Sequence, residues 1–96
     1  MREDFIKDYQ LFIDTWGIDA QILMAVEEMS ELTKELCKYK RCTITNKEEV
    51  VEHMKEEIAD VLNMTEQLEY YFGAEEIENI RKQKIERTLK RIKGGK

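Results

Sequence analysis

The chain contains no proline and only four glycines among its 96 residues, so few positions in it interrupt a helix. Its two cysteines, Cys37 and Cys42, form no CxxC pair and no set of zinc ligands, so we expect two reduced thiols near a helix end. The length excludes a TIM barrel and a two-domain dinucleotide-binding enzyme. It predicts a single domain over residues 1–96.

Long hydrophobic runs are also absent. The longest uncharged run is the seven residues Ala20–Val26, whereas a helix that spans a bilayer needs about 20 apolar residues. Charged residues interrupt any apolar leader segment at the start of the chain: Arg2, Glu3, Asp4, Lys7 and Asp8. We therefore expect no membrane association and a cytoplasmic location.

Charge is divided unevenly along the chain. Residues 1–80 contain eight basic and 20 acidic residues, a net charge of −12, whereas residues 81–96 contain eight basic residues and one acid, a net charge of +7. A basic tail can indicate nucleic-acid binding, but the acidic remainder would repel a polyanion. We therefore expect no nucleic-acid polymer as partner. A small anionic ligand, bridged to the acidic part by cations, fits both halves better.

Glu, Lys, Leu, Ile and Met dominate the composition and predict helix throughout. We expect four helices, at about residues 4–15, 20–39, 46–72 and 75–92. Gly17 and Gly73 separate consecutive helices, Asp19 is the expected N-cap of the second, and Thr45 with Glu48 reads as a capping box for the third. The short connections favour antiparallel neighbours and therefore an all-α helical bundle.

Three of these helices carry a long apolar stripe. The stripe on the second helix consists of Ile22, Ala25, Met29, Leu32 and Leu36. The stripe on the third consists of Val51, Met54, Ile58, Val61, Thr65, Leu68 and Phe72. On the fourth helix the residues expected to face inward are Ile77, Ile80, Ile85, Leu89 and Ile92. Two long amphipathic helices in so small a chain often share their apolar faces with a second subunit, so we expect a homo-oligomer whose association completes a four-helix core.

Four carboxylates follow the stripes of the second and third helices. Glu28 and Glu31 are three residues apart, as are Glu57 and Asp60, so each pair lies on one helix face, at the edge of the apolar stripe. If the stripes pack together, the four carboxylates converge and repel each other strongly. A hard divalent cation removes this repulsion, and Mg²⁺ commonly retains waters and binds substrate phosphates. The alternative is an ordinary solvated acidic face, because 21 acidic residues produce such spacings by chance.

A family signature contains these acids. The pattern Glu27-Glu28-x-x-Glu31, followed after 25 residues by Glu57-x-x-Asp60, resembles the E-E-x-x-E…E-x-x-D signature of MazG-type all-α nucleoside triphosphate pyrophosphohydrolases. The flanking residues match as well, with Gln21-Ile-Leu-Met-Ala-Val before the first block and Val61-Leu-Asn-Met after the second. Dimeric dUTPases, dCTP pyrophosphatases and phosphoribosyl-ATP pyrophosphohydrolases look like relatives, so the resemblance does not select a base or a sugar.

The resemblance, which spans about Trp16 to Arg91, implies a reaction and a set of ligands. It implies that Glu28, Glu31, Glu57 and Asp60 hold Mg²⁺, or Mn²⁺. The implied reaction cleaves a nucleoside triphosphate between its α and β phosphates, which gives the monophosphate and pyrophosphate. The implied active form is a homodimer or homotetramer whose four-helix core is built from the second and third helices. Glu27, beside the ligands, is our candidate to orient or deprotonate the attacking water.

Basic residues near the C-terminus extend the resemblance. Lys84-Ile-Glu-Arg87 resembles the family's K-F-x-R element, which contacts the substrate phosphates. Lys84, Arg87 and Arg91 form one column on a helix, so they can face a triphosphate. Lys38, on the second helix, can also reach a phosphate. The alternative for these residues is a solvated basic face and, for Lys38, a favourable interaction with the helix dipole.

Two further residues are candidates for contact with the nucleoside. Trp16 can stack on a base, although a core or interface anchor is the commoner role of such a residue. Asn63 can donate a hydrogen bond to a nucleotide or remain a surface amide. The competing function for the whole chain is a non-enzymatic helical module, which binds a basic protein partner or senses a nucleotide without hydrolysing it.

Overall fold

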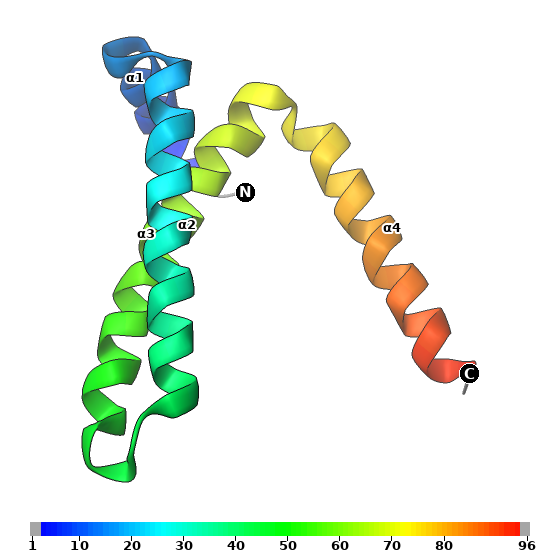
Figure 1. Cartoon of the computed structure of the whole chain (residues 1–96). Coiled ribbons are helices and arrows are strands. Elements are labelled where there is room, and N and C mark those ends of the chain that lie inside the picture. The colour runs from blue at the N-terminus through cyan, green and yellow to red at the C-terminus, as the bar shows by residue number, and fades with distance from the viewer. Residues whose placement is uncertain (1–2, 95–96) are drawn as a thin grey trace.

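The computed structural model describes residues 3–94, and nearly all of them are helical (Figure 1). The elements are η1 (Glu3–Phe5), α1 (Ile6–Trp16), α2 (Ile18–Arg41), η2 (Ile44–Asn46), α3 (Lys47–Phe72) and α4 (Ala74–Lys93). The prediction of an all-α chain with four helices is therefore confirmed. The ends of the predicted domain, residues 1–2 and 95–96, lie outside the described residues.

Two glycines separate the helices as predicted. Gly17 and Gly73 have φ angles of 89° and 125°, which residues with a Cβ rarely adopt. The amide N–H of Gly17 donates to the carbonyl oxygen of Ile13 at 2.7 Å, and that of Gly73 donates to Glu69 at 3.0 Å. Each glycine thus satisfies one free carbonyl at the end of a helix and turns the chain into the next.

Both predicted helix caps are wrong. Helix α2 begins at Ile18, so Asp19 lies inside its first turn and does not cap it. A carboxylate at that position stabilises the helix through a favourable interaction with the helix dipole. The capping box before α3 joins Thr43 and Asn46, because the Asn46 side chain accepts the backbone N–H of Thr43 at 3.1 Å. The chain is already extended at Thr43, with φ −86° and ψ 169°, so the turn starts two residues earlier than Thr45.

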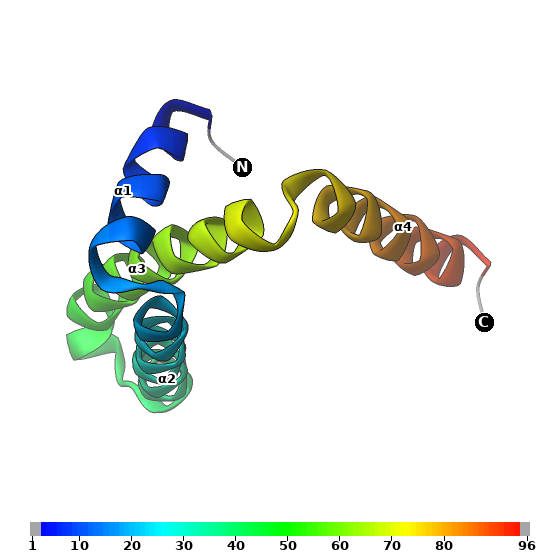
Figure 2. The same cartoon turned by 90° about the horizontal axis from the view of Figure 1, so that it is seen from above.

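Helices α2 and α3 form an antiparallel hairpin, and α1 lies across the end of it that is remote from the η2 loop (Figure 1 and Figure 2). The Tyr9 hydroxyl donates to the Glu66 carboxylate, and the Tyr70 hydroxyl donates to Gln10 at 2.5 Å. These bonds hold α1 against α3. The most deeply buried apolar side chains lie in these three helices: Tyr9, Ile13, Ala25 and Met64.

Helix α4 departs from the other three helices after Gly73 (Figure 1 and Figure 2). It has no buried residue, and the apolar side chains expected to face inward are 46–70% exposed at Ile80, Ile85, Leu89 and Ile92. The prediction that these residues of α4 face inward is therefore wrong for the single chain. The Cα radius of gyration is 16.7 Å, whereas a compact chain of this length has about 12.5 Å. The difference reflects the projecting helix.

The face of α2 that packs on α3 is more polar than predicted. Its least exposed positions alternate at spacings of four and three residues: Gln21, Ala25, Glu28, Leu32 and Glu35. Met29 and Leu36, which we expected in this interface, are 42% and 43% exposed. The helix has two adjacent apolar faces, and contact with α3 selects the one that contains the polar residues.

Apolar side chains from α2 and α3 therefore remain uncovered in the single chain. They include Leu23, Val26, Met29 and Leu36 on α2 and Ile58, Leu62 and Phe72 on α3. In an isolated soluble chain so many large exposed apolar residues are unusual. Among the described helices, none combines the length and the apolarity that crossing a bilayer requires.

Candidate metal and nucleotide site

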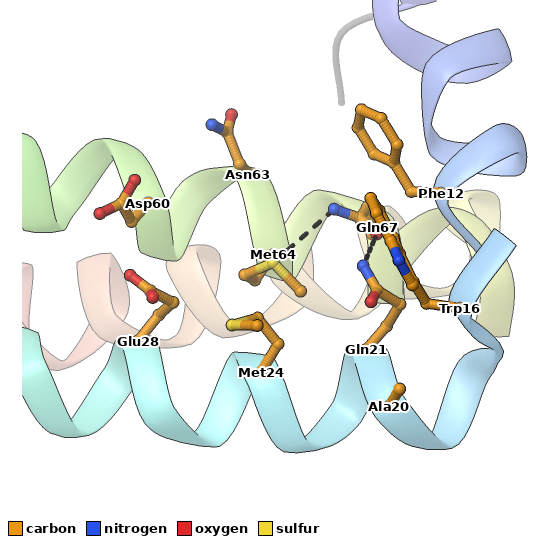
Figure 3. A pocket seen from close by; sticks show the side chains of 10 residues that line it. All are labelled: Phe12, Trp16, Ala20, Gln21, Met24, Glu28, Asp60, Asn63, Met64 and Gln67. Atoms are coloured by element: carbon orange, nitrogen blue, oxygen red, sulfur yellow. Dashed lines mark hydrogen bonds between the residues drawn. The ribbon is translucent and has the colours of Figure 1, made fainter.

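Three of the four predicted metal ligands meet where α2 packs on α3. One carboxylate oxygen each from Glu28, Glu57 and Asp60 lies within 4.8 Å of the other two. Glu28 and Asp60 point toward one another across the helix interface (Figure 3). Glu57 and Asp60 lie one turn apart on the same face of α3, and the antiparallel packing places Glu28 opposite them. We call these three residues the acidic cluster.

The acidic cluster carries electrostatic repulsion that no lysine or arginine among the described residues relieves by an ion pair. Burial, followed by the negative charge of Asp60, raises the pKa of Glu28 above its ordinary value. Burial and Asp60 also raise the pKa of Glu57, with smaller contributions from Glu31 and Glu35. Among the described residues, nothing donates a hydrogen bond to the buried Oε2 of Glu57. A buried oxygen without a donor, between repelling carboxylates, fits a divalent cation bound by oxygen ligands.

The other two predicted acids lie outside the acidic cluster. The Glu31 side chain is 52% exposed, and its carboxylate is 4.0 Å from the ammonium nitrogen of Lys34. Its charge still raises the pKa values of Glu28 and Glu57, so it lies at the rim of the cluster. Glu27 is exposed and does not line the cavity beside the acidic cluster that is described below. Its role in orienting or deprotonating the attacking water stays a prediction.

Sequence reasoning missed a further acid in the same interface. The Glu35 side chain is only 9% exposed, and its Oε2 lies 3.2 Å from the Nζ of Lys38. The other oxygen, Oε1, is buried and receives no hydrogen bond within the described part of the chain. Lys38, which we predicted to bind phosphate, is thus held by a neighbouring carboxylate. The signal for Glu35 is its position seven residues after Glu28, which places both on one helix face.

A cavity of about 530 Å³ extends from the acidic cluster toward α1 (Figure 3). Its walls combine aromatic and thioether side chains with a few polar groups. Phe12 and Trp16 come from α1, with ring centroids 5.9 Å apart, and Trp16 is 60% exposed at the mouth. Met24 and Met64 face each other along the wall, and Asn63 lies at the rim. Both predicted nucleoside contacts, Trp16 and Asn63, therefore line the same cavity as Glu28 and Asp60.

A buried pair of amides, which sequence reasoning also missed as functional, closes the cavity beside α1. Gln21 and Gln67 are 6% and 3% exposed, and the Gln21 Nε2 donates to the Gln67 Oε1 at 2.8 Å. Gln21 precedes Glu28 by seven residues, and Gln67 follows Asp60 by seven. The amide pair therefore lies two turns, about 10 Å, along both helices from the acids.

The predicted phosphate-binding column is remote from this site in the single chain. Lys84, Arg87 and Arg91 are exposed on α4, and none of them lines the cavity or belongs to the acidic cluster. Lys84 and Arg87 instead border a shallow hollow on α4 itself. Because α4 projects from the α2–α3 hairpin, one chain does not bring these cations to the carboxylates.

Comparison with known proteins adds no relative. No family model matches the sequence, and no curated protein or solved structure is similar to it. The resemblance to the MazG-type enzymes accordingly depends on the residues of the signature alone.

Proposed function

We propose that the protein is a Mg²⁺-dependent pyrophosphohydrolase that converts a nucleoside triphosphate to the monophosphate and pyrophosphate. The observation that carries this proposal is the convergence of Glu28, Glu57 and Asp60 within 4.8 Å, at one end of a cavity lined by aromatic side chains. Such a cavity suits a nucleoside, and carboxylates that pair with no lysine or arginine among the described residues suit the metal that accompanies its phosphates.

Each part of the site has a task in this reaction. Glu28, Glu57 and Asp60, with Glu31 at the rim, would hold the cation. Bound there, Mg²⁺ would supply charge neutralisation at the phosphates and acidify a water ligand. The aromatic wall at Trp16 would fix the nucleoside and so position the phosphates. The water oxygen forms a new bond to phosphorus as the α–β anhydride bond breaks, and pyrophosphate departs.

The proposed reaction involves a second copy of the chain. The single chain leaves apolar residues of α2, α3 and α4 exposed, and its basic column does not reach the acids. A homodimer would cover these faces as a four-helix core. It would also allow Lys84 and Arg87 of one copy to face the acidic cluster of the other, where cations stabilise departing pyrophosphate. A homotetramer is the larger form of the same assembly.

An endpoint assay tests the proposal. The purified protein is incubated with each common nucleoside triphosphate, in Mg²⁺ and in EDTA, and the products are separated. Monophosphate and pyrophosphate that form only with Mg²⁺ are expected. Monophosphate with two equivalents of phosphate, or diphosphate, would contradict the proposed bond cleavage. Nucleotide binding without any product would leave the nucleotide-sensing module as the function, and neither binding nor turnover would leave the protein-interaction module.

A further inference from the structure

The chemistry of Met64 fixes the direction of the hydrogen bonds in the buried amide pair. Gln67 Nε2 lies 3.7 Å from the sulfur of Met64, and Gln67 Oε1 lies 2.8 Å from the nitrogen of Gln21. A thioether sulfur accepts hydrogen bonds but cannot donate them. The Gln67 nitrogen must therefore face Met64, so its oxygen faces Gln21, which donates (Figure 3).

This arrangement leaves Gln67 with donor capacity that the protein uses poorly. Its NH₂ group has two protons, and the one acceptor within reach among the described residues is the weakly accepting sulfur. Gln67 is 3% exposed, yet it lines the cavity. A buried donor with a weak partner gains more from a strong acceptor on a ligand than a solvated donor would.

The position of the pair determines which part of a nucleotide would meet it. If the phosphates lie at the acidic cluster, the base lies toward α1, and its edge remote from the sugar reaches the Gln67 amide two turns away. At that edge uracil and hypoxanthine carry a carbonyl oxygen, whereas cytosine and adenine carry an amino group. Only the carbonyl accepts a hydrogen bond from an NH₂ group.

We propose that Gln67, held in orientation by Gln21, determines base specificity by donating to this carbonyl, so that the site prefers oxo bases to amino bases. The inference depends on the proposed binding of a nucleotide at this site. Gln67 is the group that touches the base, and Gln21 is a positioning residue. An amino base would place its NH₂ group against the buried NH₂ group of Gln67, so that two donors would face each other without an acceptor.

Trp16 provides a binding measurement that needs no turnover. It is the single tryptophan of the chain and lies at the cavity mouth, so its fluorescence reports occupancy. The probes are α,β-methylene triphosphates of uridine, cytidine, inosine and adenosine in Mg²⁺. Uridine and cytidine differ only at this carbonyl position and its ring nitrogen, as do inosine and adenosine. We expect the uridine and inosine analogues to bind about tenfold more tightly than their amino counterparts.

Two substitutions at one position make the test specific. Gln67→Met removes the donor and is expected to reduce both ratios to near one. Gln67→Glu replaces the NH₂ donor by an acceptor oxygen, and its other oxygen still accepts from Gln21. This variant is expected to prefer the cytidine and adenosine analogues. Because the added charge weakens all four analogues alike, the ratios remain informative. The control is Gln83→Glu, the same change at an exposed position of α4 that does not line the cavity, which should leave the ratios unchanged.

The outcomes separate this inference from the proposed function. Equal affinities of the oxo and amino analogues for the unmodified protein, or affinity ratios that Gln67→Met leaves unchanged, would overturn the role of Gln67. Neither result would contradict nucleotide hydrolysis, which the endpoint assay tests separately. Selective binding without hydrolysis would support Gln67 and overturn the enzyme. If Gln67→Met lowers helicity in circular dichroism, Gln21→Leu takes its place; it should reduce the ratios because Gln67 loses its orientation.

Discussion

The ammonium nitrogen of Lys38 lies 3.2 Å from Glu35 Oε2 and joins a half-exposed cation to a carboxylate buried between α2 and α3. The second Glu35 oxygen is buried without a hydrogen bond from the described residues. The Glu35 carboxylate thus lies in the interface between the two helices, and the half-exposed Lys38 ammonium neutralises its charge from the surface. This arrangement makes Lys38 important for stability, whatever its contact with phosphate.

Lys38→Met is expected to destabilise the protein by about 1–3 kcal/mol, because it leaves the Glu35 carboxylate buried without its partner. Glu35→Leu should be neutral or stabilising, since it removes the buried charge itself. Denaturant unfolding of the two variants and of the double variant measures the coupling. The surface pair Lys55–Glu52, at 3.7 Å with both side chains about 70% exposed, is the control. Lys55→Met should change stability by less than about 0.5 kcal/mol. Equal effects of the two lysine changes would contradict the argument.

Asp60→Asn is expected to abolish Mg²⁺-dependent turnover while the helices remain intact. The substitution keeps the shape of the side chain but removes the charge that a cation would bind. The product assay and circular dichroism provide the two measurements. Glu52→Gln is the matched control, an equally conservative change at an exposed position of α3, and it should retain full activity. Full activity in the Asp60 variant would discard the metal assignment.

The repulsion within the acidic cluster predicts a pH dependence of stability. The pKa values of Glu28 and Glu57 are raised above the ordinary 4.5 in the folded chain and return to it on unfolding. The folded state therefore binds more protons in the interval above 4.5. This contribution to stability is fully present below pH 4.5 and is lost as pH rises through the raised pKa values.

Thermal melts in EDTA across this interval measure the contribution. The melting temperature of the unmodified chain should fall with rising pH more steeply than that of Glu57→Gln, which lacks one titrating group. Mg²⁺ should raise the melting temperature at neutral pH by mass action and have little effect below pH 4.5, where protons occupy the ligands. A Mg²⁺ effect that is independent of pH, or is matched by the same ionic strength of NaCl, would indicate general screening.

Local signals in the sequence explain which parts of the fold could be predicted. The helices and their breaks at Gly17 and Gly73 depend on composition and on backbone freedom, which each residue carries with it. Glu28 and Asp60 could be placed together because their spacing and the antiparallel connection leave few alternatives. The caps were wrong because an extended conformation at Thr43 moved the turn, and local residue preferences did not reveal that extension.

The remaining features depend on the partner of each helix face. Gln21, Gln67 and Glu35 are residue types found mostly at the surface, so composition places them in solvent. Only the seven-residue spacing along α2 indicates that Gln21 and Glu35 share the face of Glu28. Which of two amphipathic faces packs inward is a tertiary choice. Within one chain, nothing among the described residues makes that choice for α4.

The exposed face of α4 predicts that the chain self-associates. Ile85 and Leu89 are 57% and 46% exposed and lie one turn apart on α4, a helix without a buried residue. Burying such side chains stabilises an interface by about 1.5–3 kcal/mol each. Light scattering after gel filtration is therefore expected to give a mass of at least two chains. Ile85→Glu should shift it toward the monomer, because a charge would have to be buried.

The matched control replaces a solvated residue of the same helix. Lys90→Glu also introduces a carboxylate on α4, at an exposed position five residues after Ile85 and therefore on the opposite side of the helix, and should leave the mass unchanged. If the basic column of one copy serves the acidic cluster of another, the Ile85 variant loses turnover together with association, although every predicted ligand remains. A fully active monomer would show that α4 takes no part in the site and would leave Lys84 and Arg87 as an ordinary solvated face.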